Sequence, residues 1–372
     1  MRFDTRLVHA GQDPEPGTGD LVPPVHLTAT YERRVQDPLR YFYGRGENPT
    51  WEALESSLAA LEDARYAAVF SSGQAASATA LNLLPPGRRL VAGDDLYGGT
   101  YALFETLERQ GSPVEYVDFT DAGAVAAALG RGAGLVWLET PSNPMLKVAD
   151  VAAIRGLADR QGARLVVDNT FAGPALQQPL RLGADVSVYS TTKGISGHSD
   201  VLGGALVYND QQLDRDFRSY RSVMGNVPGA FDCFLVHRGL KTLSLRAGRQ
   251  VVNAQRIAAV LAESARVGLV RYPGLAAHPQ HDLAVAQMSG PGAILSFEYL
   301  GDPVKLMDRL RLFACAVSLG GVRSLIEHPA TMTHAPLPPA TRRRLGLSDQ
   351  LLRISAGIED PADLEADLLA AL

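Results

Sequence analysis

The feature that most constrains this 372-residue chain is a regular alternation, beginning after residue 48, of short apolar runs with longer segments of helical spacing. The apolar runs are bounded by turn residues and lie at 67–71, 89–92, 114–117, 135–138, 165–167, 186–189 and 205–207. Segments rich in Ala and Leu lie before and between them, at 50–61, 75–84, 100–109, 124–129 and 151–160. Strands that alternate with helices form a parallel sheet, and strands without polar alternation are buried on both faces. We therefore predict an α/β fold with a mostly parallel seven-stranded sheet sandwiched by helices.

The same pattern divides the chain into three parts. The first 48 residues are polar and punctuated by Pro and Gly, which predicts an arm and not a domain core. From about residue 241 the alternation stops, and a long helical pattern at 246–264 is followed by shorter segments. We predict an N-terminal arm (1–48), an α/β domain (49–240) and a smaller C-terminal α+β domain (241–372).

Charge and cysteine content exclude several classes of protein. The formal net charge is −5, and a nucleic-acid or membrane-surface protein would need a basic patch, so we expect neither partner. The two cysteines, Cys233 and Cys315, are far apart in the sequence, which predicts no disulfide framework, no thiolate metal site and a reducing, cytoplasmic location. The start of the chain lacks the apolar core of a secretory signal. The uncharged stretch at 66–87 is long enough to span a bilayer, but its polar residues and prolines indicate a strand, a turn and a helix.

Two predicted strands end in residues that can do chemistry. Asp168 closes one apolar run and brings a carboxylate to the sheet edge where α/β proteins bind ligands. An Asp at this place also serves as a helix N-cap, so Asp168 alone decides nothing. Lys193 follows another run together with Ser190 and Thr192, a pattern that favours an anion held beside an amine. A lone lysine in a loop is usually solvated, and the glycines that follow Lys193 shift the balance towards function.

A third segment, Ser71-Ser72-Gly73-Gln74, joins a strand to a helix. Its small residues let backbone N–H groups approach an anion, and the helix N-terminus adds the positive end of its dipole. The segment lacks the Gly-Lys-Ser/Thr ending of a P-loop and the Gly-x-Gly-x-x-Gly fingerprint, so nucleotide binding has little support.

Together these segments supply a phosphate cradle, an amine that can form a Schiff base and an acid that can pair with a pyridinium. Pyridoxal 5'-phosphate requires this combination. Its ring accepts electrons only while the ring nitrogen is protonated, and a buried carboxylate such as Asp168 stabilises that charge. Lys193 would hold the aldehyde and later shuttle protons. We therefore predict pyridoxal phosphate as the cofactor.

Ordered motifs along almost the whole chain carry a resemblance to a known family. They are Tyr43-Gly44-Arg45, Asn48-Pro49-Thr50, Ser71-Ser72-Gly73, Asp95-Leu96-Tyr97-Gly98-Gly99-Thr100, Glu139-Thr140-Pro141-Ser142-Asn143-Pro144, Asp168-Asn169-Thr170, Ser190-Thr191-Thr192-Lys193, Gly197-His198-Ser199-Asp200, Arg238-Gly239-Leu240-Lys241-Thr242, Ser318-Leu319-Gly320-Gly321, His328-Pro329-Ala330-Thr331-Met332-Thr333-His334 and Arg353-Ile354-Ser355. The sequence resembles the trans-sulfuration (Cys/Met metabolism) family of fold-type I pyridoxal-phosphate-dependent enzymes. That family includes cystathionine γ-lyase, cystathionine γ-synthase, cystathionine β-lyase, methionine γ-lyase and O-acetylhomoserine sulfhydrylase.

The resemblance implies how the cofactor is held. Lys193 would be the Schiff-base lysine and Asp168 the partner of the ring nitrogen. Tyr97 would stack on the cofactor and act near the leaving group, which makes Lys193, Asp168 and Tyr97 the catalytic residues. The phosphate would be held by the backbone amides of Gly73 and Gln74 and by the hydroxyls of Ser190 and Thr192.

The resemblance also implies a substrate site and an assembly. Asn143 would contact the cofactor's phenolic oxygen or the substrate carboxylate, and Arg353, assisted by Ser318, would clamp that carboxylate with a bidentate fork. A surface ion pair is the alternative for Arg353, but its apolar strand-like setting argues against it. Tyr43 and Arg45 would reach the phosphate in a neighbouring subunit of a homotetramer built as a dimer of dimers.

Two other readings of the polar residues fail on the sequence. The histidines at 278, 281, 328 and 334 lack the cysteines or acidic cluster that would complete a metal site, so we expect none. The run Gly197-His198-Ser199-Asp200 contains the residue types of a hydrolase triad, but neighbours on one loop do not form that relay.

The motifs do not decide between elimination and replacement at the substrate, because both reactions use the same residues. Relatives that handle cystathionine often carry an Arg and a Glu where this chain has Ala102 and Val317, which favours a substrate with an uncharged distal end, such as methionine or homocysteine. Against this, Gly99 stands where many methionine γ-lyases carry Cys.

We predict a C–S γ-lyase that converts a small sulfur amino acid, L-methionine or L-cystathionine, to 2-oxobutanoate, ammonia and a thiol. The alternatives are a γ-replacement enzyme (cystathionine γ-synthase or O-acetylhomoserine sulfhydrylase), a β-lyase and, remotely, a non-catalytic binding protein on the same fold.

Overall fold

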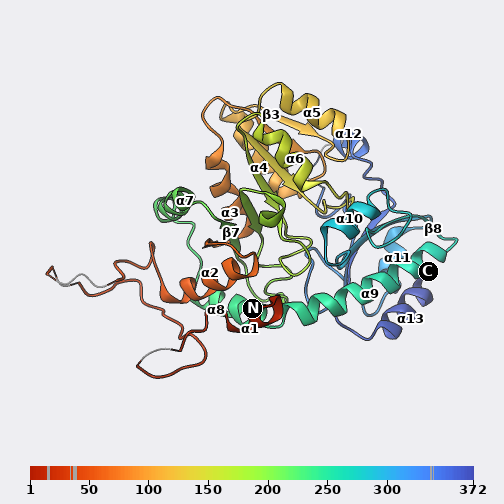
Figure 1. Ribbon diagram of the computed structural model, residues 1–372. Helices are drawn as coiled ribbons and strands as arrows, with labels where there is room; N and C mark the ends of the chain where they lie inside the picture. Colours follow the sequence, from red (N-terminus) through yellow and green to blue (C-terminus); the bar gives the residue numbers. More distant parts are fainter. Residues whose placement is uncertain (15–16, 34, 37–39, 336, 338) are drawn as a thin grey trace.

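The computed structural model describes residues 1–372 except 15–16, 34, 37–39, 336 and 338. Two sheets organise the described chain, one on each side of the molecule in Figure 1. The first has seven strands in the order β1-β7-β6-β5-β4-β2-β3. Their bounds are β1 (Tyr66–Phe70), β2 (Leu90–Gly93), β3 (Val114–Val117), β4 (Leu135–Glu139), β5 (Arg164–Asp168), β6 (Val186–Tyr189) and β7 (Gly204–Tyr208).

Six of these strands, β1 to β6, run in the same direction, and β7 is antiparallel to both of its neighbours, β6 and β1. The predicted α/β fold with a mostly parallel seven-stranded sheet is therefore confirmed. The antiparallel β7 follows β6 through a connection without a helix, so it lacks the crossover that brings a parallel strand back into register.

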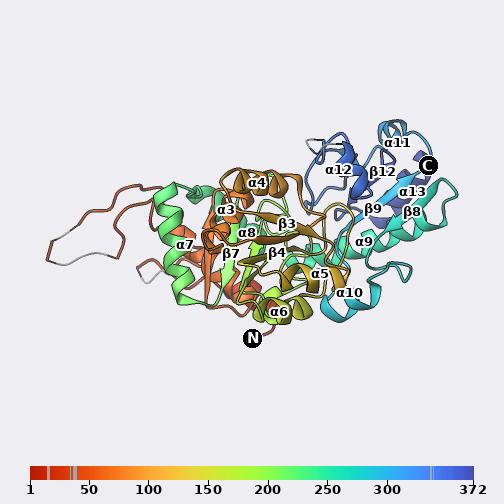
Figure 2. The same cartoon turned by 90° about the horizontal axis from the view of Figure 1, so that it is seen from above.

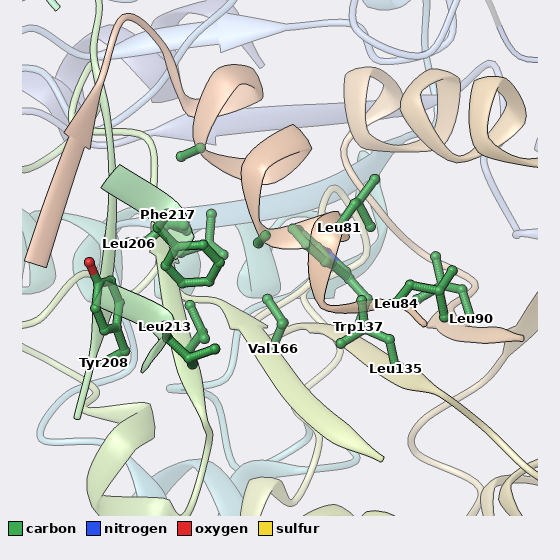
Figure 3. Packing of buried hydrophobic residues seen from close by; sticks show 14 of the residues in the cluster. Leu81, Leu84, Leu90, Leu135, Trp137, Val166, Leu206, Tyr208, Leu213 and Phe217 are labelled. Atoms are coloured by element: carbon green, nitrogen blue, oxygen red, sulfur yellow. The ribbon is translucent and has the colours of Figure 1, made fainter. Parts of the chain in front are cut away.

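Helices cover both faces of this sheet, which explains the lack of polar alternation in the strands. In β4, Leu135 and Trp137 contact one hydrophobic cluster, and Val136 and Leu138 contact another on the opposite face. Figure 3 shows Trp137 in the first cluster, beneath the helical segment that carries Leu81. The helices of the first cluster are α3 (Gly73–Ala80), α4 (Gly98–Arg109) and α7 (Gln211–Met224). The helices of the opposite face are α5 (Ala122–Gly130) and α6 (Val151–Asp159). At the β1–β7 end of the sheet, this face is covered by α2 (Pro49–Leu61) and α8 (Ala230–Leu240).

The second sheet is smaller, with the strand order β10-β11-β12-β9-β8. Its strands are β8 (Val267–Arg271), β9 (Ile294–Tyr299), β10 (Ala314–Cys315), β11 (Leu325–Glu327) and β12 (Leu351–Ser355). The long helix α9 (Leu243–Glu263) and the helices α11 (Pro303–Arg309) and α13 (Pro361–Ala371) pack with it, and α10 (His281–Gln287) and α12 (Pro339–Arg344) lie on the side nearer the first sheet (Figure 2).

The segment predicted as an arm begins with a helix, α1 (Phe3–His9), which that prediction did not include. Leu7 of α1 is 1% exposed and packs against α2 beside Trp51 and Leu54. The described residues between α1 and α2 extend away from the body of the molecule (Figure 1). The boundaries of the three predicted parts stay a prediction. Among the described residues, none of the helices is both long and apolar enough for a membrane span.

Candidate active site

A cavity of about 260 Å³ lies where the carboxyl ends of β4, β5 and β6 face the second sheet. Ten of the twelve residues predicted for the site line it: Gly73, Gln74, Tyr97, Asn143, Asp168, Ser190, Thr192, Lys193, Ser318 and Arg353. Parallel strands end at the same sheet edge, so residues far apart in the sequence converge there.

Lys193 lies in the turns that follow β6, and its side chain is largely buried. Its Nζ donates a hydrogen bond to Ser318 Oγ at 2.8 Å. Burial, aided by the nearby guanidinium of Arg353, lowers the pKa of Lys193 from 10.5 to about 8. A lysine with a lowered pKa has a larger neutral fraction near pH 7, and the neutral amine is the form that attacks a carbonyl.

The loop after Lys193 is held by Arg246 of α9, which the sequence reasoning missed. The buried guanidinium donates to the backbone carbonyls of Gly194 (2.7 Å), Ile195 (3.1 Å) and Gly239 (2.7 Å). Gly197 has φ +73°, and a Cβ at this position would overlap the same guanidinium. Arg246 thus fixes the backbone next to the lysine.

Asp168 ends β5 and is buried, and its Oδ1 accepts a hydrogen bond from the backbone N–H of Thr170 at 3.0 Å. Burial raises the pKa of Asp168 above its usual value, and the hydrogen bonds from Thr170 offset part of that rise. Glu139, at the end of β4, is the direct register partner of Asp168 and also lines the cavity. Burial, with the charge of Asp168, raises the pKa of Glu139 well above its usual range. In the sequence, Glu139 is only the first residue of a family motif, and its type and position there indicate no role.

The start of α3 forms the expected cradle for an anion. Ser72 caps this helix, its Oγ accepting from the N–H of Ala75 at 3.1 Å. A Cβ on Gly73 would lie 2.8 Å from the Cβ of Ser190, so only glycine lets the helix terminus come this close. Thr192 exchanges hydrogen bonds with the backbone of Gly203, which places its side chain at the same edge.

Tyr97 precedes α4, and its ring lines the cavity with 44% exposure. Its backbone N–H donates to Glu139 Oε2 at 3.0 Å. The ring lies close to Gly99, where a Cβ would be 2.5 Å from Tyr97 Cε1. Gln74 adds a hydrogen bond from Nε2 to the Gly99 carbonyl at 2.7 Å, which ties the helix of the cradle to the segment that carries Tyr97.

Arg353, in the middle of β12, is 2% exposed and points into the cavity from the second sheet. Its Nη1 donates to Asn143 Oδ1 at 2.8 Å, and its Nη2 donates to the backbone carbonyl of Ser318 at 2.9 Å. Ser318 therefore assists Arg353 through its carbonyl, while its hydroxyl contacts Lys193. Arg353 is also paired with Glu327 at 3.0 Å, an ion pair that is buried and not on the surface. Burial raises the pKa of Glu327 above its usual value, and the positive charge of Arg353 offsets part of that rise.

Tyr43 and Arg45 do not line this cavity. Arg45 Nη1 donates to the backbone carbonyl of Ser222 in α7 at 2.7 Å, and its guanidinium lies 5.7 Å from the centre of the Tyr43 ring. Val317, which is 54% exposed, and the exposed Leu202 both line the cavity. Ala102 is not part of the lining.

The histidines for which the sequence predicts no metal site contact backbone carbonyls. His278 faces the carbonyl of Leu146, His281 that of Pro273 and His328 that of Asp349. In the part of the chain that the structure describes, no three His, Cys, Asp or Glu side chains come together as metal ligands.

The cavity fits pyridoxal phosphate on its own chemistry. The glycine-tight helix terminus with Ser190 and Thr192 suits a phosphate, the amine of Lys193 suits an aldehyde, and the buried carboxyl group of Asp168 suits a protonated ring nitrogen.

Comparisons with known proteins agree with this fit. A family model described as "Cys/Met metabolism PLP-dependent enzyme" matches residues 4–372. The cystathionine γ-synthase of Mycobacterium tuberculosis is 47% identical over 99% of this chain and 96% of its own length. A solved cystathionine γ-lyase from Micromonospora echinospora has a TM-score of 0.98 and 60% identity, covering 100% of this chain and 99% of its own. An apo structure from the same organism, described as a methionine γ-lyase, has a TM-score of 0.95 and 59% identity with the same coverage.

Proposed function

Because this chain belongs to the Cys/Met metabolism family of pyridoxal-phosphate-dependent enzymes, we propose that it is a carbon–sulfur γ-lyase of sulfur amino acids. The substrate is L-methionine or L-cystathionine, and with one water it gives 2-oxobutanoate, ammonia and a thiol. The observation that carries the choice of substrate is the uncharged outer part of the cavity. Val317 and Leu202 offer no charge to a distal amino-acid group, which favours methionine over cystathionine. The names of the two solved Micromonospora structures, a cystathionine γ-lyase and a methionine γ-lyase, support the same reaction.

The proposed roles follow the positions of the side chains. Bound cofactor supplies a ring that withdraws electrons from the substrate Cα. The amides at the start of α3, with Ser190 and Thr192, hold its phosphate, and Lys193 holds its aldehyde. Asp168 would keep the ring nitrogen protonated through the negative charge of its carboxylate, which lines the cavity at the edge of the sheet.

The remaining residues act on the substrate. Arg353 binds its carboxylate, beside Asn143 and Ser318. Lys193, once released from the aldehyde, takes the Cα proton, and its lowered pKa suits that task near neutral pH. Tyr97 is placed at the cavity to give a proton to the departing sulfur.

The test is to supply L-methionine, L-cystathionine, L-cysteine and O-acetylhomoserine separately to the holoenzyme and to identify the keto acid and sulfur products. We expect 2-oxobutanoate from methionine or cystathionine, and none from the Lys193→Ala variant. Pyruvate from cystathionine would show a β-lyase instead. Turnover of O-acetylhomoserine only in the presence of an added thiol would show a γ-replacement enzyme, the candidate that the Mycobacterium relative favours.

Val317→Glu gives a sharper test of the distal pocket. A carboxylate at this half-exposed place would attract the ammonium group of cystathionine and give nothing to a methylthio group. We expect the ratio of kcat/KM for cystathionine over methionine to rise roughly fivefold or more, as an ion pair of about 1 kcal/mol predicts. Val304→Glu, an equally exposed valine outside the cavity, is the matched control and leaves the ratio unchanged.

We further propose a cytoplasmic homotetramer in which Tyr43 and Arg45 complete the phosphate site of a neighbouring subunit. The exposed apolar side chains of the extended segment, Leu21, Leu27 and Val35, support an interface there. Light scattering measures the assembly, and a monomer that retains full cofactor affinity would contradict the shared site.

A further inference from the structure

The carboxylate-binding side of the cavity contains an anion of its own. Glu327 of β11 is the direct register partner of Arg353 in β12, and the two side chains approach to 3.0 Å. They are 1% and 2% exposed. A close, buried ion pair compensates the positive charge that a substrate carboxylate would otherwise meet. Arg353 is thus partly neutralised before any substrate arrives.

The placement of the guanidinium does not depend on Glu327. Nη1 of Arg353 also donates to Asn143 Oδ1, and Nη2 donates to the carbonyl of Ser318, while the backbone of Arg353 is fixed inside the second sheet. Glu327 is held separately, its Oε1 accepting from Thr333 Oγ1 at 2.9 Å. Removing the charge of Glu327 with an isosteric amide therefore leaves the guanidinium in place and changes its electrostatic surroundings.

Arg353 has an unsatisfied hydrogen-bond donor, and Glu327 has an unsatisfied acceptor. Nε of Arg353 and Oε2 of Glu327 are buried without a hydrogen-bond partner among the described residues, and such groups are costly to leave unpaired. A ligand carboxylate that uses the free Nε–H donor of Arg353 would share the guanidinium with the carboxylate of Glu327, which is paired with Nη1. Two carboxylates that share one guanidinium repel each other, and this repulsion weakens binding by roughly tenfold or more.

We propose that Glu327 competes with the substrate carboxylate for Arg353 and so keeps the affinity for amino acids and oxo acids low. Glu327 acts on the carboxylate ligand through Arg353, because it lowers the net positive charge of the carboxylate site. The benefit is faster release of the 2-oxo acid product, which carries the same carboxylate as the substrate. This inference rests on the proposed function only in requiring a carboxylate-bearing ligand at Arg353.

The test compares two unreactive ligands that differ by one carboxylate, L-alanine and ethylamine. Each is titrated into holoenzyme, and binding is followed by the visible absorbance of the cofactor. We expect Glu327→Gln to bind L-alanine about tenfold more tightly than the wild type does, a change in binding free energy of about 1.4 kcal/mol. The affinity for ethylamine should differ far less between the variant and the wild type. Any effect of Glu327 on the amine of Lys193 enters both titrations and cancels in their ratio.

Glu298→Gln is the matched control, because it removes a carboxylate from β9, the strand beside β12, at a partly exposed place outside the cavity. It should leave both affinities unchanged. An alanine-to-ethylamine affinity ratio that is unchanged or lower in Glu327→Gln would overturn the proposal. Simple damage to the fold weakens ligands and does not produce tighter binding of one of them.

Should Glu327→Gln not yield folded holoenzyme, Glu327→Asp serves as the second variant. It keeps the charge but withdraws it from Arg353 by one methylene, so we expect tighter alanine binding by a smaller factor, and a wild-type ratio would contradict the competition. The titrations record binding without turnover. The product assay therefore reveals failure of the proposed γ-lyase reaction independently of this result.

Discussion

Lys193 should destabilise the protein when the cofactor is absent, and replacing it by Met should stabilise the cofactor-free chain. The amine is largely buried beside the guanidinium of Arg353, and together these lower its pKa from 10.5 to about 8. At about 1.4 kcal/mol per pKa unit this difference corresponds to about 3 kcal/mol. Met keeps the volume and the apolar stem and removes the charge. Allowing for the residual solvation of the amine, we expect Lys193→Met to be about 2 kcal/mol more stable at pH 7.

The lowered pKa of Lys193 also determines in which direction the stability of the wild type changes with pH. Below pH 8 the lysine is protonated in both the folded and the unfolded chain, so the cost of burying its charge is fully present. Between pH 8 and 10.5 the unfolded chain binds more protons at this position, and the stability of the wild type therefore rises with pH. The advantage of the Met variant should be largest at pH 7 and close to zero above pH 10.5.

Urea unfolding of the cofactor-free proteins at pH 7 and pH 10.5 measures both quantities. Lys305→Met is the control, because Lys305 is exposed and its replacement should give no pH-dependent difference. Equal unfolding midpoints for Lys193→Met and wild type at pH 7 would refute the reasoning. So would an advantage of the same size at both pH values.

Three further substitutions test the remaining parts of the site. Asp168→Asn removes the charge that stabilises the protonated ring nitrogen, so turnover should fall by roughly two orders of magnitude while absorbance still shows bound cofactor. Gly204→Ala would drive a Cβ into the carbonyl oxygen of Ser72 at the phosphate cradle, so cofactor should be lost on dialysis faster than from Gly156→Ala, whose Cβ meets open space. Arg353→Lys replaces a bidentate fork by a point charge, so KM for the amino acid should rise roughly tenfold or more with a smaller change in kcat.

The strands of the first sheet were predictable from sequence because each is apolar on both faces. The helices on the two faces bury alternate residues of every central strand, as they do in β4, so a plain apolar run marks each strand. The direction of β7 was not predictable in the same way. Its apolar run looks like the others, and only the absence of a crossover helix after β6 distinguishes it.

The site residues that are predictable from sequence lie at strand ends or in family motifs, whereas the others depend on contacts between elements that are distant in the sequence. Glu327 meets Arg353 because β11 and β12 are neighbours in the second sheet, although 26 positions separate them. Arg246 reaches the loop of Lys193 from a helix whose residues otherwise look like an ordinary amphipathic surface. Neither partner has a local signal in the sequence, because the contact that defines its role is made only by the fold.

The pairing of Glu139 with Asp168 shows how such a contact changes the chemistry of a residue that the sequence does reveal. Two buried carboxyl groups on adjacent strand ends repel each other when both are ionised, so one of them keeps its proton. Glu139 accepts a hydrogen bond from the backbone N–H of Tyr97, and its pKa is raised well above the usual range by burial and by the charge of Asp168. Asp168 has Thr170 as a hydrogen-bond donor on its own loop. Burial raises the pKa of Asp168 as well, but the charge of Asp168 raises the pKa of Glu139 further, which favours the proton on Glu139 and the negative charge on Asp168.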